Sequence, residues 1–398
     1  MSVLTYEYRL YPRKHENAAL EGLLEEGREV YNAALQQCKV VYEVMGKHQT
    51  ALSQWDYFRE WRKQAGIRLN ASSVQHILRR ADKAYRAFFR RVKAQQTPGH
   101  PRFKGVEQFK SLEYTYGDGC RLEYDATWDR MVLYIQNVGK LKIKLHRRLP
   151  QHSVIKHVVL KRRASGWYVY LMLEVPDPVA VPPNGLPEVG VDMGLLRLLT
   201  LSDGTQIDNP RWLRAALAEL RIAQRRLARR NKGSTGRKAA RQLVAKVHEH
   251  VANVRRDFWH KTTHGLVHRY RLIALERLPL SFMTHNSHLA LSAHDAGLGA
   301  FQTTLAYKAV NAGSQVVFVN PAYTSQVCSG CRAIVQKSLS VRVHACPHCF
   351  LTLDRDVNAA INILSVALKS ARTEPSGVNV DALTVMRSLR SFPLQRGE

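Results

Sequence analysis

Four of the six cysteines lie in one short stretch and form two CxxC motifs. Cys328 and Cys331 make the first motif and Cys346 and Cys349 the second, with 14 residues between the pairs. Each CxxC knuckle can direct two thiolates at one tetrahedral Zn²⁺, and the intervening length suits a short hairpin. Two disulfides are the competing interpretation, but the N-terminal segment shows no secretion signal. A redox pair is rarely flanked by basic residues. We therefore expect one structural zinc ion.

The chain carries a large excess of positive charge. It has 60 Lys+Arg against 32 Asp+Glu, which gives a net charge of +28 over 398 residues. Such an excess predicts a polyanionic partner, and nucleic acid is favoured over an anionic membrane. A hydrophobic content of 45% is typical of a folded protein rather than of a disordered basic tail. No apolar run approaches the length of a membrane span, so we expect no membrane partner.

Two helical segments concentrate this charge. Residues 72–93 combine an apolar face with seven basic residues, and residues 211–271 carry 17 Lys+Arg against three acids. The second segment predicts a helical hairpin that turns near 231–236. A run of charged residues is usually a solvent-exposed surface. In these two segments, however, nearly all of the charges are positive, which favours contacts with phosphates. The candidate nucleic-acid contacts are Arg79, Arg80, Lys83, Arg86, Arg90, Arg91, Arg225, Arg226, Arg229, Arg230, Arg255 and Arg256.

The N-terminal half predicts a β-domain. Residues 3–11 and 111–175 contain short β-branched and aromatic runs between turn residues, as in a small barrel or sandwich. The helices between 15 and 110 would then be an insertion in this domain. Residues 176–187 contain five prolines in 12 residues and predict a linker.

Beyond the linker, strands and helices alternate, which predicts an α/β region. Its expected strands include 189–192, 271–276 and 315–319, with a helix at about 295–312. The residues after 371 have only a weak pattern and predict a flexible tail.

Three carboxylates stand at the ends of apolar elements in this region. Asp192 ends the strand Val189–Val191, Glu276 ends a second strand, and Asp356 lies at the head of a helix. Carboxylate oxygens suit Mg²⁺, and two Mg²⁺ ions suit phosphodiester hydrolysis. Each acid alone is more often a cap or turn residue, and Asp354 is a rival for the third position.

Several segments together resemble the TnpB (OrfB) family, transposon-encoded RNA-guided DNA nucleases related to miniature type V CRISPR effectors. Val-Gly-Val-Asp-Met-Gly at 189–194, Leu-Glu-Arg-Leu at 275–278 and Asp354–Ile363 resemble its three RuvC motifs. Further matches are Tyr8–Pro12, Pro101–Lys104, the basic helices at 225–262, and Thr324–Cys328 at the entry to the zinc ribbon. Phe350 departs from the family's usual Gly, and Arg197 and Leu198 depart from its usual Asn and aromatic residue.

The resemblance implies a multidomain α+β fold. It comprises a small β-barrel with an inserted helical domain, then an RNase H-like (RuvC) α/β domain that carries an inserted zinc ribbon. The implied domains are a wedge-like, guide-RNA-binding barrel at 1–14 and 111–180, a helical recognition domain at 15–110, the RuvC domain at 187–323 and 354–370, the zinc ribbon at 324–353, and the tail at 371–398.

The resemblance also implies the activity. Asp192, Glu276 and Asp356 would be catalytic Mg²⁺ ligands, and Asp356 is preferred because the family's acid lies between Arg and x-Asn-Ala-Ala. The implied partners are a guide RNA from the transposon end and a double-stranded target DNA with a short target-adjacent motif. We expect a monomer on RNA in the prokaryotic cytosol or nucleoid.

Three alternatives stay open at this point. A nuclease-inactive, RNA-guided DNA-binding regulator would share the fold, although such relatives typically lose an acid and this chain keeps all three. A compact type V CRISPR effector would differ only in lying beside a repeat array. A conventional DNA-joining transposase is less favoured, because no separate helix-turn-helix module is recognisable.

Overall fold

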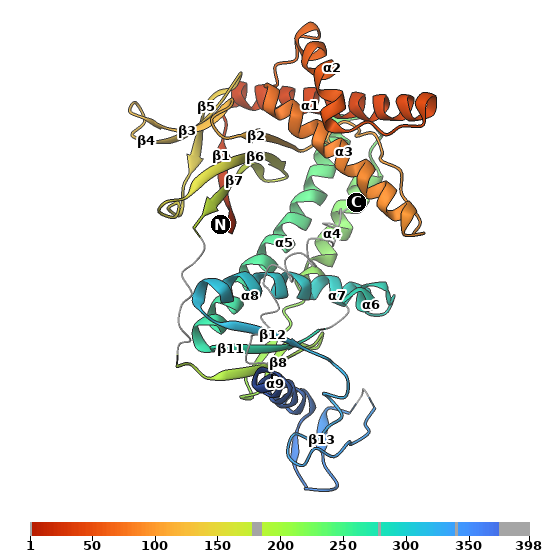
Figure 1. The fold of residues 1–398 in the computed structure, drawn as a ribbon, viewed down its shortest axis with the longest axis vertical. Helices are drawn as coiled ribbons and strands as arrows, with labels where there is room; N and C mark the ends of the chain where they lie inside the picture. Colours follow the sequence, from red (N-terminus) through yellow and green to blue (C-terminus); the bar gives the residue numbers. More distant parts are fainter. Residues whose placement is uncertain (1, 177–184, 278–279, 339–340, 374–398) are drawn as a thin grey trace. The chain divides into compact units, whose positions relative to one another are not determined.

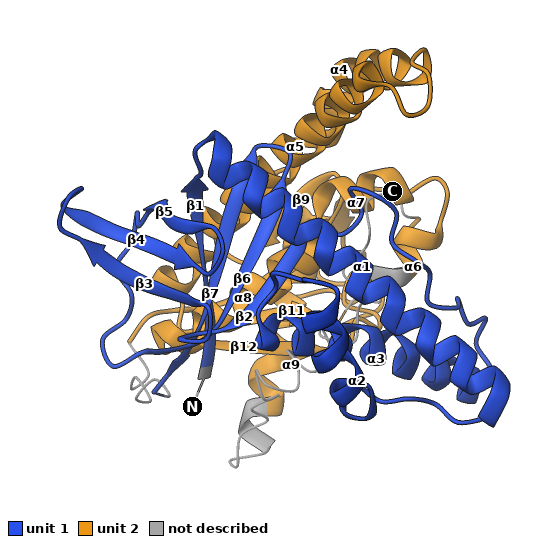
Figure 2. Cartoon of the chain, turned by 90° about the horizontal axis from the view of Figure 1, so that it is seen from above, with its two compact units in different colours: residues 1–177 blue, residues 178–398 orange. Residues whose placement is uncertain are grey.

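A computed structural model describes residues 2–176, 185–277, 280–338 and 341–373. The chain divides into two compact units, residues 1–177 and 178–398 (Figure 2). The expected linker at 176–187 falls largely outside the described residues, as does most of the tail after 371. No helix within the described ranges has the length and apolar character needed to cross a bilayer.

A seven-stranded antiparallel sheet forms the β part of the first unit. Its strand order is β2-β6-β7-β1-β5-β4-β3, so the N-terminal strand lies in the middle. β7 alternates buried and partly exposed residues along its length, as expected for a strand with one face on a core. The strands are β1 (Ser2–Tyr11), β2 (Ser111–Thr115), β3 (Cys120–Asp125), β4 (Arg130–Ile135), β5 (Gly139–Lys144), β6 (Val154–Arg163) and β7 (Gly166–Val175).

The expected small β-barrel is confirmed only in part. β2 and β3 are the two ends of the strand order, and the described residues contain no ladder that joins them. The sheet is therefore a half-barrel. β3 was not predicted from the sequence, because its run Cys-Arg-Leu-Glu-Tyr-Asp mixes charged residues with apolar ones.

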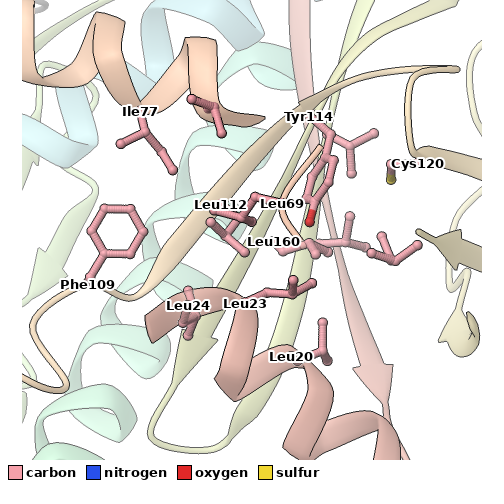
Figure 3. Packing of buried hydrophobic residues seen from close by; sticks show 14 of the residues in the cluster. Leu20, Leu23, Leu24, Leu69, Ile77, Phe109, Leu112, Tyr114, Cys120 and Leu160 are labelled. Carbon is pink, nitrogen blue, oxygen red and sulfur yellow. The ribbon is translucent and has the colours of Figure 1, made fainter. Parts of the chain in front are cut away.

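Three helices follow β1; the first and third pack on this sheet, and the second packs on these two helices. α1 (Lys14–Met45) and α3 (Ala71–Lys93) match the predicted helices, whereas α2 (Ala51–Gln64) was not predicted. Leu20, Leu23 and Leu24 of α1 lie against Leu112 and Leu160 of the sheet (Figure 3). Burial of these side chains contributes about 1.5–3 kcal/mol each.

Helix α3 also covers the free edge of β2. The Ser73 hydroxyl donates to the Glu113 carbonyl at 3.0 Å, and Arg80 Nη1 donates to the Ser111 carbonyl at 3.3 Å. The Thr115 N–H donates to the Ser72 hydroxyl at 3.4 Å. Side chains of the helix thus satisfy backbone groups of an edge strand, which would otherwise be open to pairing with another chain.

The second unit contains a mixed five-stranded sheet of order β10-β9-β8-β11-β12. β8, β9 and β10 run antiparallel, whereas β11 pairs in parallel with both β8 and β12. The strands are β8 (Glu188–Met193), β9 (Arg197–Leu201), β10 (Gln206–Asp208), β11 (Leu272–Glu276) and β12 (Gln315–Val319). A two-stranded sheet pairs β13 (Val343–Ala345) with β14 (Thr352–Asp354).

Helices cover both faces of the mixed sheet. α5 (Thr235–Arg269) and α8 (Leu298–Ala312) contribute Trp259 and Phe301 to the core on one face. α9 (Arg355–Thr373) contributes Ile363 and Ala367 to the core on the other. Figure 1 shows α8 and α9 on opposite sides of β8, β11 and β12. The remaining helices are α4 (Trp212–Ala228), α6 (Leu280–His285) and α7 (Ala290–Ala296).

The basic hairpin has the predicted form, since α4 and α5 turn through residues 229–234. The helix expected at about 295–312 is α8, and the short helix α7, which was not predicted, precedes it. They are separated at Gly297, whose φ of +63° is a left-handed conformation that glycine adopts without a Cβ penalty.

Candidate active site and four-cysteine cluster

Asp192 and Glu276 lie at the same end of two neighbouring parallel strands. The β8–β11 register pairs Gly190 with Ala274 and Val191 with Leu275, so the next pair along is Asp192 with Glu276. Side chains alternate between the faces of a strand. Ala274 belongs to the core that α9 covers, so Glu276 and Asp192 point to this same face.

Gly190 brings α9 onto the strand that carries Asp192. A Cβ at this position would lie 1.9 Å from the Ala360 carbonyl oxygen and 2.8 Å from the Leu364 nitrogen, so only glycine permits this approach. Asp356 lies one helical turn before Ala360, toward the strand end where Asp192 lies. The three predicted carboxylates therefore come from three elements to one edge of the sheet.

Asp356 and Asp354 have different surroundings. Asp356 is in the first turn of α9, and its Oδ1 accepts from Arg355 Nε at 3.1 Å. Asp354 precedes the helix, and its Oδ1 accepts from the Asp356 N–H at 2.8 Å, as an N-cap residue does. Its Oδ2 accepts from Arg197 Nη1 at 2.9 Å. Asp354 is therefore occupied in starting the helix and in holding Arg197.

The three carboxylates influence one another electrostatically. Burial, together with the neighbouring Glu276 and Asp356, raises the pKa of Asp192 to about 7. Burial also raises the pKa of Glu276, although a hydrogen bond from the Thr324 hydroxyl opposes the rise. Within the described ranges, these side chains do not each bring an oxygen within 4.8 Å of the other two.

The four cysteines form a compact cluster. One Sγ from each of Cys328, Cys331, Cys346 and Cys349 lies within 4.8 Å of the other three. The Sγ atoms of Cys328 and Cys349 are 3.6 Å apart, and those of Cys331 and Cys346 are 3.5 Å apart. Thiolates about 2.3 Å from a tetrahedral zinc ion would be separated by about 3.8 Å. The donor set and its spacing thus fit one Zn²⁺.

Each CxxC motif is closed by its own backbone. The Arg332 N–H donates to the Cys328 carbonyl at 3.0 Å, and the Phe350 N–H donates to the Cys346 carbonyl at 3.0 Å. Arg332 and Phe350, which follow the second cysteine of each motif, have φ values of +67° and +61°. Both residues thus adopt the left-handed conformation, which costs free energy for any residue with a Cβ.

Two buried asparagines connect the cysteine cluster to the carboxylates. Asn358 Oδ1 accepts from the Ser329 N–H at 2.9 Å, and its Nδ2 donates to the Val327 carbonyl at 2.8 Å. Asn362 Nδ2 donates to the Thr324 carbonyl at 2.9 Å, and Thr324 in turn donates to Glu276. The sequence did not predict this role, although Asn358 lies in the third motif, because spacing alone does not show the partner of an amide.

The predicted basic residues divide into exposed and inward-facing groups. On α3, Arg79, Lys83, Arg86 and Arg90 are exposed at steps of four, three and four, so they form one helical face. Arg225, Arg226, Arg229, Arg230 and Arg256 are also exposed, whereas Arg91 is half-buried.

Two members of the predicted set face inward and contact the protein itself. Arg80 lies over Phe109 and donates to β2. Arg255 Nη1 donates to the His294 and Asp295 carbonyls.

Comparison with known proteins identifies the family. Residues 170–287 match the OrfB family described as "Probable transposase", and residues 299–363 match the Cas12f1-like TNB domain. A Streptomyces pristinaespiralis protein described as "Putative RNA-guided DNA endonuclease" is 31% identical over 375 residues, covering 92% of this chain and 90% of that protein. The chain belongs to the TnpB (OrfB) family. Its Escherichia coli relative InsQ, also described as "Putative RNA-guided DNA endonuclease", is 27% identical and covers 90% of this chain and 91% of that protein.

Solved structures of compact effectors share the fold of this TnpB family member. The Cas12f1 chain in a complex with sgRNA and target DNA matches with a TM-score of 0.56 and 16% identity, over 88% of this chain and 82% of that chain. The mini-RNA-guided endonuclease CRISPR-Cas_phi3 matches with a TM-score of 0.53 and 9% identity, over 92% of each chain. These likenesses concern the fold alone.

Proposed function

We propose that this TnpB family member is an RNA-guided DNA endonuclease of a transposable element that cleaves target DNA next to a short target-adjacent motif. The observation that carries the proposal is the convergence of Asp192, Glu276 and Asp356 on one edge of the mixed sheet. The curated relatives described as RNA-guided DNA endonucleases support the same activity. In this proposal the second unit is an RNase H-like (RuvC) domain at 187–323 and 354–370.

The carboxylate cluster fits Mg²⁺ by its chemistry. Three carboxylates, which are hard oxygen donors, gather at this edge, and burial together with the neighbouring Glu276 and Asp356 raises the pKa of Asp192. Two Mg²⁺ ions are the arrangement that suits phosphodiester hydrolysis. When bound, Mg²⁺ would activate the attacking water and stabilise the leaving oxygen.

The chain's own residues supply position and charge around these carboxylates. Gly190 fixes the depth of α9, and Asp354 orients the helix N-terminus that presents Asp356. The Thr324 hydroxyl donates to Glu276 and so orients one of its oxygens. Arg355 and Arg342, whose Nη1 is 3.6 Å from Asp356 Oδ2, contribute positive charge beside the carboxylates.

The four-cysteine cluster is proposed to hold one structural Zn²⁺ in a ribbon at 324–353. The Sγ spacing supports this assignment, as do the paired backbone turns. Although burial opposes it, N–H groups of Cys349 and His348 lower the pKa of Cys346 to about 6. Against the Leu351 N–H, burial and the neighbouring thiols raise the pKa of Cys349 to about 12, so the cluster does not hold four thiolates until a cation offsets their charge.

The guide RNA is proposed to bind the half-barrel at 1–14 and 111–180. One face of this sheet pairs basic and aromatic side chains. Arg9 and Lys142 lie over Tyr11, and Arg163 lies over Tyr168. Tyrosine rings stack with unpaired bases, and the flanking cations contact phosphates.

The exposed face of α3, within the helical region at 15–110, is proposed to contact the guide–target duplex. The α4–α5 hairpin is proposed to contact nucleic acid through its exposed arginines.

Cleavage by isosteric variants tests the active site. The full chain is purified with its co-expressed guide RNA and incubated with a matching plasmid and Mg²⁺. Asp192→Asn, Glu276→Gln and Asp356→Asn should each lower the cleavage rate at least about a thousandfold, non-additively, while RNA and target binding persist. Asp354→Asn should be much milder, because an amide oxygen still caps α9.

The controls decide between the open alternatives. Asp208→Asn, at an exposed position on β10, should cut like the parent. If the parent binds target without cutting it, the chain is a regulator rather than a nuclease. If Asp354→Asn abolishes cleavage and Asp356→Asn does not, the third ligand is misassigned. If RNA-free protein cuts with the same selectivity, RNA guidance is refuted.

A further inference from the structure

A second cluster of potential metal ligands lies in the first unit, among side chains that the proposed nuclease activity does not use. His76 of α3, Glu113 of β2 and His157 of β6 each bring a ligand atom within 4.8 Å of the other two. His76 Nδ1 is 3.4 Å from Glu113 Oε1, and His157 Nδ1 is 3.8 Å from the same oxygen. The two imidazole rings lie edge to face, with centroids 5.2 Å apart.

The sheet explains how the cluster forms. Thr115 of β2 lies opposite His157 of β6, and Glu113 is two residues from Thr115 on the same face of the strand. Glu113 and His157 are therefore diagonal neighbours, within reach of each other's side chains. The contacts of Ser72 and Ser73 with the edge of β2 bring His76, one turn later in α3, over this pair.

The spacing is that of donors around one metal ion. Ligands about 2.05 Å from a tetrahedral Zn²⁺ are separated by about 3.3 Å. The two nitrogen–oxygen distances of 3.4 and 3.8 Å are close to this value. Two imidazoles and one carboxylate are the ligand set of many sites for Zn²⁺ and neighbouring divalent metals, which leave one further position open.

The hydrogen-bonding state of the two histidines agrees with metal binding. His76 Nε2 lies 3.3 Å from the Thr115 hydroxyl. If Nε2 carries the proton and donates to Thr115, the lone pair of Nδ1 faces Glu113, in the arrangement that orients a ligating histidine. His157 Nδ1 is buried and has no hydrogen-bond partner. A bound cation would give this atom the partner that a buried polar atom requires.

The competing interpretation is a protonated His–Glu pair. Burial lowers the pKa of His76 more than the neighbouring Glu113 raises it, and His157, Arg79 and Arg80 lower it further. The neutral imidazole is the form that binds metal, so its surroundings favour a ligand over an imidazolium.

We propose that His76, Glu113 and His157 bind one divalent transition-metal ion of the Zn²⁺ class, with water in the open position. The ion cross-links α3 to two strands of the half-barrel. It is a second metal centre, separate in composition from the four-cysteine cluster. Its consequence is structural, because it fixes the helix that carries the exposed Arg79, Lys83, Arg86 and Arg90.

Metal stoichiometry and cobalt spectroscopy test the proposal on the full RNA-bound chain. The protein is stripped with a chelator, supplied with excess Mg²⁺ to occupy RNA phosphates, titrated with Co²⁺ or Zn²⁺, and desalted. The parent should retain two transition-metal ions per chain. His76→Gln and Glu113→Gln should each retain one, with the intense thiolate-to-cobalt absorption of the cysteine cluster unchanged.

His157→Gln and His15→Gln complete the test. His157 is less buried than His76, so its loss threatens folding least, and it should also remove one ion. His15, whose side chain is 72% exposed in the same unit, is the matched control and should leave two. Added Zn²⁺ should raise the Tm of the parent more than that of His157→Gln. The proposal is overturned if the parent binds one ion, or if His157→Gln binds and responds to Zn²⁺ as the parent does.

Discussion

The four cysteines and the three carboxylates are two clusters of anionic side chains in one unit, and they are assembled in opposite ways. The cysteines come from two tight turns, and each turn is closed by hydrogen bonds within a few residues. The carboxylates come from β8, β11 and α9 and meet only because the sheet register and the packing of α9 bring them together. One cluster is local and fits a metal that would stabilise the fold, whereas the other depends on the whole fold and repels itself.

Loss of a cysteine should have the largest structural effect. Cys331→Ser removes one of four thiolates, so the ribbon should lose a zinc contribution that reaches about 10 kcal/mol in small zinc domains. Because Asn358 and Asn362 connect the ribbon to α9, cleavage should fall as well.

Thiolate-to-cobalt absorption and the Tm of the full chain measure this effect. Cys38→Ala is the control for cobalt absorption, since Cys38 lies outside the cluster, burial raises the pKa of its thiol to about 11, and the thiol donates to the Gln49 carbonyl at 3.7 Å. Unchanged cobalt absorption in Cys331→Ser would show that this cysteine is not a ligand.

Gly190→Ala should have the next largest effect. It tests whether the position of Asp356 depends on the packing of α9 against β8. The added Cβ would clash with the Ala360 carbonyl at 1.9 Å, so α9 must move away from β8. We expect a loss of about 1–3 kcal/mol of stability. Cleavage should fall about a hundredfold, because Asp356 moves with the helix. Chemical denaturation and the cleavage rate measure the two effects.

Gly265→Ala is the matched control for Gly190→Ala. Gly265 lies inside α5, where an added Cβ meets nothing within 4 Å. Alanine there should stabilise the helix by up to about 1 kcal/mol without slowing cleavage. If Gly190→Ala and Gly265→Ala have the same stability and the same cleavage rate, the close approach of α9 to β8 is contradicted.

Asn362→Ala tests whether the two clusters are coupled. The change removes the amide that donates to the Thr324 carbonyl, whereas the Val327 carbonyl keeps its bond from Asn358, and we expect a cost of about 1–3 kcal/mol. Because Thr324 also donates to Glu276, cleavage should decline more than zinc affinity. Ser365→Ala, which loses one exposed bond from Arg332, should change stability by less than about 0.5 kcal/mol. If Asn362→Ala cleaves DNA at the parental rate, the cysteine cluster and the carboxylates are not coupled through Asn362.

The same contrast explains what could be predicted from the sequence. The CxxC spacing placed all four thiolates, because a knuckle is a local structure. The three carboxylates were also placed together, but their joint significance rested on the family resemblance. Neither Gly190 nor Asn362 could be assigned a role, because each acts through a contact between elements distant in the sequence. In the first unit, β3 and α2 were missed because their sequences lack a clear period.

Asp192→Asn should raise stability while it abolishes cleavage. The pKa of Asp192 is raised to about 7 by burial and by its carboxylate neighbours, so the folded protein favours the protonated form. The stability linked to that proton is therefore present below the ordinary aspartate pKa and is lost as the pH rises through about 7. With chelator above this pH, the variant should gain about 0.5–2 kcal/mol. A lower Tm for the variant under these conditions would show that the cluster is not self-repelling.

Phe350→Gly should have the smallest effect, and it tests whether the cysteine cluster is itself free of strain. The φ of Phe350 is +61°, a backbone conformation that costs free energy for a residue with a Cβ. Its side chain is 84% exposed, so burial of the ring offsets little of that cost. Glycine should relieve about 0.5–1 kcal/mol, seen as a few-fold tighter zinc binding in competition with a chelator. Arg332 is the counterpart in the first knuckle, with a φ of +67°, but its guanidinium donates to Asn362 and Ser365. Arg332→Gly should therefore weaken zinc binding although it relieves the same backbone strain. If Phe350→Gly weakens zinc binding as much as Arg332→Gly does, the Phe350 side chain stabilises the knuckle by more than its left-handed backbone destabilises it.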